Sequence, residues 1–439
     1  MITTSGPALR ATATMIALLL SACDDKIAPP STQYGAHPML PPPQQYILPP
    51  MDVPTAVGWK NGEAPKVPAG LQVQALASDF KHPRMVYALP NGDVLVVESN
   101  GPKAPVYRPK DYIEAKVKAI AGSAGTGGNR ISLLRDVNGD GRPDIRTVFI
   151  DHLHSPFGVI LVGDRLYVAD TDEILSFHYT SGQTRMTASG TRLTDLPAGP
   201  IDHHWTKSLA ASPDGSKLYV GVGSNSNITE NGLAAEEGRA AIWEVDRATG
   251  MKRIYASGLR NPTGLAIEPH TGKLWAIVNE RDEIGPNLVP DYLTAVKENG
   301  FYGWPYSYFG QHVDVRVEPQ RPDLVAKAIW PDYALSSHVA PLGIVFSEKS
   351  SLPNRYRSGV FVGEHGSWDR TPLNGYKVVY IPFVNGRPSG PPQDVLTGFA
   401  TADGREAMGR PVGVALDRTG ALLIADDVGN TVWRVTAAK

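Results

Sequence analysis

Six copies of one hairpin pattern run along most of the 439-residue chain. In each copy, an apolar strand is followed by turn residues and then by a second apolar strand. The first copy combines apolar residues 85–89, the turn residues Asn91 and Gly92, and apolar residues 94–97. The other copies begin at Gly158, Ser208, Gly264, Gly343 and Gly413. Short apolar runs on either side of such turns predict β-hairpins.

Successive hairpins lie roughly 50–80 residues apart, so elaborated loops must join them. One hairpin cannot bury both of its faces, whereas six radially packed four-stranded sheets bury them and protect their edges. The sequence therefore predicts an all-β, six-bladed β-propeller over residues 66–439, with a β-sandwich as the alternative. The 44 Gly and 38 Pro residues suit a fold with many turns. Asp291 to Glu298 is the candidate helix, within a loop.

The N-terminus has the pattern of a secretory signal. Apolar residues 15–20 are too few to cross a bilayer, and small residues separate them from the single cysteine, Cys23. We predict a signal peptide over residues 1–22 and lipid attachment at Cys23; the alternative is an ordinary signal with a chance cysteine. Asp24 favours retention at the inner membrane. We expect a periplasmic protein that contacts the membrane only through this anchor.

Residues 23–65 are rich in proline, which favours extended conformations and buries little surface. We predict that they form a tether between the membrane and the propeller. The alternative is a segment wrapped on the domain, with Tyr46, Ile47 and Leu48 docked against it. The formal net charge of −2 gives no electrostatic reason to expect binding to nucleic acid.

One loop has the ligand spacing of a calcium site. Residues 136–144 place oxygen donors at alternate positions, with Gly141 at the sixth, which is the rhythm of carboxylate and amide oxygens around a hard cation. Thr147 stands where a full EF-hand needs Glu, so we predict a structural calcium site at most. The alternative is a metal-free turn stabilised by its Asp and Asn side chains. The predicted ligands are Asp136, Asn138, Asp140 and Asp144.

Polar residues recur where the hairpins begin. His203 and His204 come just before the third hairpin, and a neutral imidazole near pH 7 can remove a hydroxyl proton. Arg260 and Asn261 hold the same place before the fourth hairpin, where a planar guanidinium suits a polycarboxylate. A structural hydrogen bond or a cross-blade tie is the alternative for each. His338 precedes the fifth hairpin and Arg410 the sixth.

Charged and aromatic residues also gather where two of the hairpins end. Glu280, Asp282 and Glu283 surround Arg281 after the fourth hairpin; they are candidate metal ligands or a solvated loop. Residues 363–370 after the fifth hairpin contain His, Trp and Arg between glycines. Scattered surface charge would not recur at one position around a ring, so these residues predict a common site.

Residues 258–265, with their Arg-Asn-Pro-x-Gly sequence, and residues 302–305, Tyr-Gly-Trp-Pro, resemble the quinoprotein sugar dehydrogenases of the soluble glucose and aldose sugar dehydrogenase group. With residues 279–283 and 364–368, the pattern is most similar to the L-sorbosone dehydrogenase branch. The resemblance covers about residues 66–439. It implies a six-bladed propeller that holds pyrroloquinoline quinone (PQQ), with calcium bridging the quinone.

The resemblance also implies roles for single residues. His204 matches the catalytic base, with His203 the less favoured neighbour, and Arg260 and Asn261 match the pair that contacts the quinone. Calcium at PQQ is expected in the loop of Glu280, Arg281 and Asp282, although the Gly-Pro of the glucose enzymes comes later here, at residues 285–286. The remaining residues expected to bind the cofactor are His338, His365, Arg370, Lys377 and Arg410.

The implied reaction is PQQ-dependent oxidation of an aldose or of L-sorbosone. His204 would take the hydroxyl proton, hydride would pass to calcium-bound PQQ, and Arg260 would stabilise the developing charge. Electrons would leave to an external cytochrome or quinone, since no Cys-x-x-Cys-His haem motif is present. The alternatives are a calcium-dependent lactonase-type hydrolase and a non-catalytic propeller that scaffolds envelope proteins.

Overall fold

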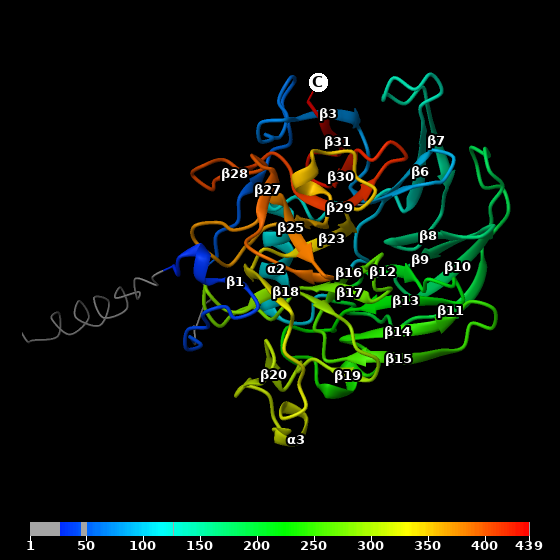
Figure 1. The fold of residues 1–439 in the computed structure, drawn as a ribbon. Helices are drawn as coiled ribbons and strands as arrows, with labels where there is room; N and C mark the ends of the chain where they lie inside the picture. Colours follow the sequence, from blue (N-terminus) through cyan, green and yellow to red (C-terminus); the bar gives the residue numbers. More distant parts are fainter. Residues whose placement is uncertain (1–26, 45–50, 126, 439) are drawn as a thin grey trace, which may run out of the picture.

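The computed structural model describes residues 27–44, 51–125 and 127–438. Six antiparallel sheets surround a common centre (Figure 1), which confirms the predicted six-bladed β-propeller. From the centre outwards, the first blade contains β4 (Pro83–Ala88), β5 (Val94–Glu98), β6 (Arg130–Arg135) and β7 (Ile145–Ile150), and the second contains β8 (Gly158–Val162), β9 (Arg165–Ala169), β10 (Glu173–His178) and β11 (Thr191–Asp195). The third contains β12 (Lys207–Ala211), β13 (Lys217–Val222), β14 (Ala241–Asp246) and β15 (Lys252–Ser257), and the fourth contains β16 (Pro262–Ile267), β17 (Leu274–Val278), β18 (Pro290–Ala295) and β22 (Tyr333–Ser337). The fifth contains β23 (Pro341–Phe346), β24 (Gly359–Glu364), β25 (Lys377–Val384) and β27 (Gln393–Leu396), and the sixth contains β29 (Pro411–Leu416), β30 (Leu422–Asp426), β31 (Thr431–Ala437) and β3 (Leu71–Ala77).

The remaining elements are short and lie in the loops or at the blade edges. They are β1 (Tyr34–Gly35), β2 (Thr55–Ala56), β19 (Gly300–Phe301), β20 (Ser307–Tyr308), β21 (His312–Val313), β26 (Arg387–Pro388), β28 (Glu406–Ala407), the helices α2 (Pro109–Ile120) and α3 (Pro322–Val325), and three short 3-10 turns at Pro30–Thr32, Leu233–Glu236 and Asn354–Tyr356. No helix within the described part of the chain has the length and apolar character needed to cross a bilayer.

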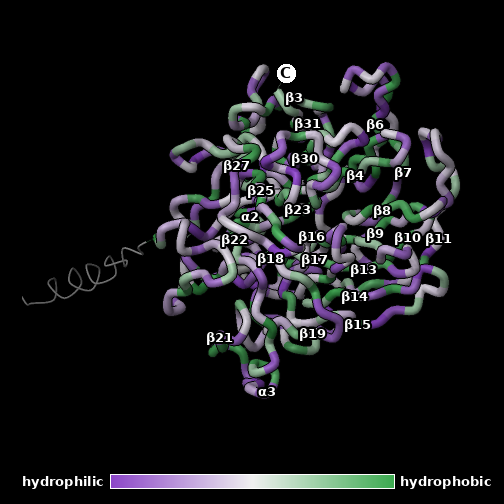
Figure 2. Tube along the Cα trace, in the orientation of Figure 1, coloured by the Kyte–Doolittle hydropathy of each residue, from purple (hydrophilic) through white to green (hydrophobic). Residues whose placement is uncertain are grey.

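The hydrophobic core is divided among the spaces between blades. Six clusters of buried apolar side chains occur among the described residues; five join two neighbouring blades, and the one at the closure of the ring joins the first and last blades and also includes Leu342 of β23. The second strands β5, β17, β24 and β30 are buried along their whole length because a neighbouring blade covers each face. Figure 2 shows hydrophobic residues gathered along the blade strands. The ring therefore satisfies the need of each hairpin to bury two faces.

The ring closes where the two ends of the propeller sequence meet. β3, the first long strand, pairs antiparallel with β31, the last strand, so that Leu71 lies opposite Ala437. The innermost strands β29 and β4 pack against each other across this closure. The sixth blade thus combines a strand from the N-terminal end of the propeller sequence with three strands from its C-terminal end. This shared blade closes the ring between the first and last blades.

The N-terminal residues differ from the predicted tether. β1 adds a strand to the outer edge of β22, with Tyr34 opposite Leu335. β2 pairs in parallel with β28, and the indole Nε1 of Trp59 donates to Asp426 Oδ2 at 2.7 Å. Residues 27–44 and 51–65 therefore wrap on the propeller: the backbone of β1 pairs with the outer edge of β22, and the Trp59 indole reaches the buried carboxylate of Asp426 at the end of β30. The predicted signal peptide, Cys23, Asp24 and residues 46–48 lie outside the described residues.

The predicted loop helix at Asp291–Glu298 is wrong. Most of this segment is β18, which pairs with β17 on one side and β22 on the other. Tyr292 and Leu293 are both fully buried, so the two-sided packing of the blade overrides local helical preference. The longest helix of the described chain is instead α2, in the loop between β5 and β6. Pro109 occupies its first turn, and Asp111 Oδ2 accepts hydrogen bonds from the Tyr107 and Arg108 amides.

Candidate active site on one face of the propeller

All six innermost strands begin on the same face of the ring, and all six second strands end there. We call this face the N-face, because it contains the N-terminal ends of β4, β8, β12, β16, β23 and β29. The first residue of an inner strand pairs with the last residue of the second strand: Pro262 pairs with Val278, Pro341 with Glu364 and Pro411 with Asp426. Residues before an inner strand and residues after a second strand are therefore neighbours. This topology brings most of the sequence-predicted site residues to one face.

His204 lies before β12 and is half-buried. Its Nδ1 lies 2.9 Å from the carbonyl oxygen of Ser224, so the proton on Nδ1 donates to that oxygen and Nε2 is left as an acceptor. Burial, together with the positive charge of Arg260, holds the pKa of His204 well below its ordinary value. The imidazole is therefore neutral at pH 7 and has the state that a general base requires. The His203 ring meets it edge-on, with centroids 4.6 Å apart.

Asn261 lies beside His204, and Gly223 makes this approach possible. A Cβ atom at residue 223 would lie 2.4 Å from Asn261 Oδ1 and 2.5 Å from His204 Cβ. Any larger side chain would therefore push these two groups apart. The Oδ1 atom of Asn261 is buried and has no hydrogen-bond partner among the described residues. A buried amide of this kind is suited to a ligand that supplies the missing partner.

Arg260 is buried and binds groups of the chain itself. Its Nη2 donates to Asn227 Oδ1 and Asp282 Oδ2, each at 3.0 Å, and its Nη1 donates to the carbonyl oxygen of Glu280 at 2.5 Å. The guanidinium thus fixes the loop that follows β17. Its positive charge also acts on the neighbouring His204. The predicted contact between Arg260 and a quinone stays a prediction.

Asp282, His338 and Asp369 form one cluster next to Arg260, with His338 and Asp369 buried and Asp282 half-buried. Nδ1 of His338 lies 3.5 Å from Asp282 Oδ1 and 3.3 Å from Asp369 Oδ1, and its Nε2 lies 2.9 Å from the Gly285 carbonyl oxygen. Burial alone would lower the pKa of His338, but Asp369 and Asp282 raise it to about 9. The three side chains could also converge on a metal ion, because their ligand atoms lie within 4.8 Å of one another.

Two predicted calcium ligands next to Asp282 differ in what they offer. Glu280 is buried, and burial raises its pKa to about 7; its Oε1 has no partner among the described residues. The Arg281 side chain instead forms an ion pair with Asp314, with Nη1 2.6 Å from Oδ2. A guanidinium is never a calcium ligand, so the side chain of Arg281 is excluded and only its backbone oxygen is left for that role.

Arg370 and Arg410 are buried cations without acidic partners. They are 4% and 5% exposed, and no carboxylate of the described residues lies within 4.0 Å of either guanidinium. Arg370 Nη1 donates to the Pro286 carbonyl oxygen and to Ser337 Oγ, both at 3.0 Å. Arg410 Nη2 lies 3.0 Å from the Tyr376 hydroxyl. Each keeps a buried Nε with no acceptor. Burying a charge unpaired is costly, so these arginines favour an anionic ligand.

His365 and Lys377 take different positions. His365 Nε2 lies 2.9 Å from Asp427 Oδ2, and burial lowers the pKa of His365 to about 4. Asp427 also forms an ion pair with Arg84, so this cluster joins three blades on the N-face. The structure does not bring Lys377 to the inner strands, because its Nζ lies 2.8 Å from Asp394 Oδ1 on the outermost strand of its blade.

The loop of residues 136–144 is the turn between β6 and β7, the two outer strands of the first blade. It is mostly exposed and lies away from the inner strands. Asp136 accepts the backbone N–H groups of Gly139 and Gly141 at 2.7 and 2.8 Å. Asp144 Oδ2 accepts the Val137 N–H at 2.7 Å. The oxygens thus stabilise the turn, as the metal-free alternative expects. Calcium binding by Asp136, Asn138, Asp140 and Asp144 stays a prediction.

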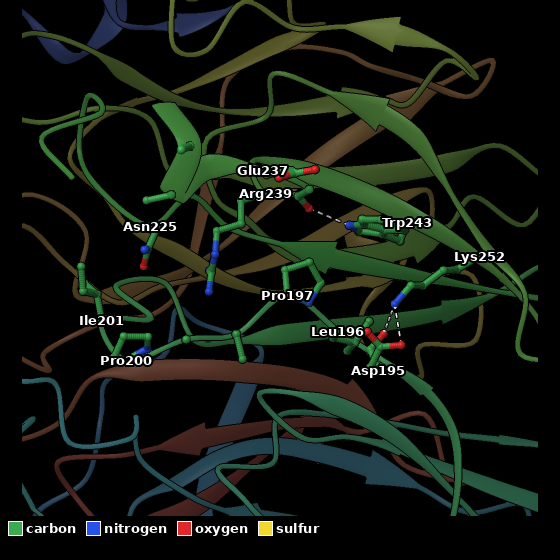
Figure 3. Close-up of a pocket in the computed structure, with 15 residues that line it drawn as sticks. Asp195, Leu196, Pro197, Pro200, Ile201, Asn225, Glu237, Arg239, Trp243 and Lys252 are labelled. Carbon is green, nitrogen blue, oxygen red and sulfur yellow. Dashed lines mark hydrogen bonds and ion pairs between the residues drawn. The ribbon is translucent and has the colours of Figure 1, made fainter. Parts of the chain in front are cut away.

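A separate depression with a cavity volume of about 550 Å³ lies beside the site, between the second and third blades (Figure 3). It is lined by residues 195–201, 234–235 and 237–239, with Asn225, Trp243 and Lys252. Its charges are paired, since Lys252 Nζ lies 2.9 Å from Asp195 Oδ1 and Arg239 forms an ion pair with Asp202 at 2.8 Å. With every cation partnered, it offers less to an anionic ligand than the N-face does.

Several functional candidates were missed by sequence reasoning. Arg84, Asp369 and Asp427 each join a polar cluster on the N-face. A signal for Arg84 was present, because four of the inner strands begin with proline, which suits the first position of a strand. These prolines are Pro83, Pro262, Pro341 and Pro411. The proline that begins an inner strand therefore identifies residues of the N-face in the first blade, where Arg84 lies, as well as in the fourth, fifth and sixth blades.

The fold and the site define a six-bladed β-propeller with a buried polar cluster on one face. The TrAA12-like family model matches residues 142–299 and 322–438, more than half of the chain. The chain belongs to the TrAA12-like family. An uncharacterised protein of Borreliella burgdorferi is 27% identical over 297 residues, 65% of this chain and 77% of that one.

Two fungal proteins are similar in structure. The PQQ domain of pyranose dehydrogenase from Coprinopsis cinerea, in its holo form, has a TM-score of 0.69 at 21% identity and covers 88% of this chain and all of that domain. The calcium structure of the Trichoderma reesei family AA12 enzyme has the same TM-score at 18% identity, with 88% of this chain and 100% of that chain covered. In sequence, the PQQ-dependent pyranose dehydrogenase of C. cinerea is 25% identical over 262 residues. That match spans 50% of this chain and about a third, 35%, of the pyranose dehydrogenase.

Proposed function

We propose that this chain is a PQQ-dependent sugar dehydrogenase that oxidises a sugar at its lactol or aldehyde carbon. One observation carries the proposal: Arg370 and Arg410 are buried on the N-face without acidic partners. Such cations favour a bound anion, and PQQ is a planar quinone with several carboxylates. The solved propellers with similar folds include a PQQ domain, which supports this choice of anion.

The residues of the N-face fit PQQ. Arg370 and Arg410 would hold carboxylates through their planar guanidinium groups, and the unpartnered Oδ1 of Asn261 would accept a hydrogen bond from a ligand N–H or O–H group. When bound, the quinone supplies the two-electron chemistry that no side chain of this chain can supply. His204 then accepts the sugar hydroxyl proton at Nε2, since Nδ1 is committed to Ser224. Burial and, after it, the positive charge of Arg260 lower the pKa of that imidazole, so that it is neutral and ready to accept the proton.

We also propose that calcium binds in the loop after β17, near the quinone. The candidate oxygen donors are the carboxylates of Glu280, Asp282 and Asp369, which suit a hard cation. Glu280 Oε1 is buried without a hydrogen-bond partner among the described residues, and Asp369 Oδ1 makes no hydrogen bond there, its near neighbour being His338 Nδ1 at 3.3 Å. Both oxygens are therefore suited to a hard cation. A calcium structure exists for the similar T. reesei propeller. In this arrangement His338 would lie next to the cation as a neighbour of both aspartates.

The substrate, the electron acceptor and the location remain proposals. We propose a pyranose, another aldose or L-sorbosone as substrate, and a cytochrome or membrane quinone as external acceptor. Lipid attachment at Cys23 in the periplasm would place the enzyme beside a membrane-bound acceptor. The motifs at residues 279–283 and 364–368 support the sorbosone choice, and the pyranose dehydrogenase similarity supports a pyranose.

Reconstitution of the purified chain tests the function. PQQ and calcium are added to the apo-protein, and aldoses, pyranoses and L-sorbosone are screened with a dye acceptor. The expected result is dye reduction that needs PQQ, together with a change in the quinone absorbance when sugar is added. Lactone hydrolysis without any quinone would establish a hydrolase instead. Failure to bind PQQ at micromolar concentration would refute the dehydrogenase proposal and favour the alternative of a non-catalytic scaffold protein.

A further inference from the structure

Helix α2 lies on the N-face beside the candidate active site. It belongs to the loop between β5 and β6, and Asn100 Nδ2 donates to the Ser123 carbonyl oxygen at 2.8 Å just after the helix. Glu114 Oε1 lies 3.9 Å from Nδ1 of His203. At the C-terminal end of the helix, Gly122 packs so closely on Ala56 that a Cβ there would lie 2.8 Å from the Ala56 Cβ. The helix is therefore part of the rim of the site.

Helix α2 turns a charged residue towards the propeller and apolar residues towards solvent, which is the reverse of the usual arrangement. Glu114 is directed towards His203, while Tyr112, Ile113 and Ile120 are exposed by 56%, 52% and 50%. At about 100° per residue, these three side chains and Lys116 fall within one arc of about 100°. Nζ of Lys116 lies 4.8 Å from the centroid of the Tyr112 ring. Surface helices normally turn their apolar side to the core, so this exposed apolar arc needs another partner.

The segment around the helix is positively charged although the whole chain is not. Residues 101–122 contain five basic and two acidic residues, a formal charge of +3, against −2 for the complete chain. Val106 and Tyr107, just before the helix, are exposed by 58% and 69% and extend the apolar surface. Exposed aromatic and branched side chains next to lysines are the features of helices that lie in the interface of an anionic bilayer.

The path of the N-terminal chain brings the N-face towards a membrane. The backbone N–H of Ala28 donates to Asn287 Oδ1 at 2.9 Å, in the loop that leads from β17 on the N-face. Cys23 is only five residues before Ala28, and five extended residues span at most about 18 Å. If Cys23 is lipidated, as the sequence predicts, this loop lies within about that distance of the bilayer. Only the residues between Cys23 and Ala28 would then separate this loop from the lipid.

We propose that the exposed arc of α2, with Val106 and Tyr107, is a docking surface for an anionic lipid bilayer. The apolar side chains enter the interfacial region, and Lys103 and Lys116 contact the lipid headgroups. The propeller then sits on the membrane with the rim of its active site facing the bilayer. This docking does not depend on PQQ and does not depend on covalent lipid, which would only add to it.

Vesicle binding tests the docking surface. The predicted mature chain, residues 23–439 with Cys23→Ser, is sedimented with vesicles of phosphatidylcholine alone or with 30% phosphatidylglycerol. We expect binding to the anionic vesicles that weakens at high salt. The triple variant Tyr112→Ser, Ile113→Ser, Ile120→Ser should bind at least tenfold more weakly, and Lys103→Gln with Lys116→Gln should remove the dependence on phosphatidylglycerol. A Tyr112→Trp variant should be quenched by brominated lipid more strongly than its parent.

A matched control replaces exposed apolar residues on the opposite face. Met251→Ser with Val384→Ser changes side chains that are 72% and 58% exposed, at turns on the other side of the ring. This variant should bind vesicles as the parent does. The proposal fails if the parent does not bind anionic vesicles, or if the triple variant binds equally well. A concentration-dependent dimer of the parent that the triple variant loses would assign the surface to self-association instead.

Discussion

The Nδ1 atom of His204 lies 2.9 Å from the carbonyl oxygen of Ser224. A carbonyl oxygen only accepts, so the ring proton must be on Nδ1 and the free lone pair on Nε2. Ser224 follows β13 while His204 precedes β12, and the antiparallel pairing of these strands on the N-face brings the two residues together. The identity of the proton-accepting atom is therefore set by the topology of the third blade.

Replacement of His204 tests its role as the base. His204→Gln should lower kcat by about 10²–10⁴-fold, since that is the usual contribution of general-base catalysis. PQQ affinity should change little, because Arg370 and Arg410 are intact. Initial rates with a dye acceptor and quinone titration measure the two quantities separately. His203→Gln is the matched control and should keep most of the activity; a larger loss in this variant than in His204→Gln would assign the base to His203.

The dependence of kcat/KM on pH should reveal the depressed pKa of His204. The base acts in its neutral form, so activity falls as the pH drops through its pKa. Because burial and Arg260 lower that pKa, the acid limb should have its midpoint below pH 6.5, the ordinary value for histidine. Rates measured from pH 4 to pH 8 at saturating cofactor check this. An acid limb centred at or above pH 6.5 would contradict the environment described for His204.

Arg410→Met should separate cofactor binding from folding. The variant removes a buried charge without a carboxylate partner, so the unfolding free energy of the cofactor-free chain should fall by less than about 1 kcal/mol. PQQ affinity should fall by about 30-fold or more, as expected when a buried charge pair with a ligand is lost. Urea unfolding and quinone titration measure these effects. Lys377→Met is the control: an equal loss of affinity there would mean that Lys377 reaches the cofactor after all.

The ion pair of Arg84 with Asp427 should be one of the strongest stability determinants of the N-face. Asp427→Asn leaves the buried Arg84 without its acidic partner and should cost about 3–5 kcal/mol of unfolding free energy. The double variant with Arg84→Met should lose less than the sum of the single variants. Urea denaturation measures all three. The half-buried surface pair of Lys217 and Asp246 is the comparison, and Lys217→Met should cost much less, because water still screens that pair. Additive losses for Arg84 and Asp427 would refute the coupling.

The sequence was sufficient to predict the propeller and the common face on which the residues before the inner strands lie. The repeated hairpins determined the fold because each must bury two faces, and the residues before Pro262, Pro341 and Pro411 do lie on one face. Sequence could not reveal what those residues contact there. Arg281 appears within an acidic loop, yet its side chain pairs with Asp314, 33 residues later. Lys377 likewise pairs with Asp394, which pattern alone does not bring near.

The N-terminal segment shows a second limit. Proline content predicted an extended conformation for residues 23–65, and the described part is indeed mostly irregular. Whether such a chain stays free depends on partners that local composition does not contain. Gln33 is fully buried against Asn287, Ser337 and Arg370, residues about 250 to 340 positions away. Long-range contacts of this kind are set by the completed ring and not by the segment itself.

The pairing of β3 with β31 determines when the propeller can finish folding. The partner of Leu71 is Ala437, so the first long strand cannot complete its sheet until almost all of the propeller has left the ribosome. Until then β3 presents an unsatisfied edge, the kind of surface to which other chains attach. Contacts between such distant residues also slow folding. The last step of assembly is therefore also the most vulnerable one, and the nascent chain must be protected from its neighbours until the ring is closed.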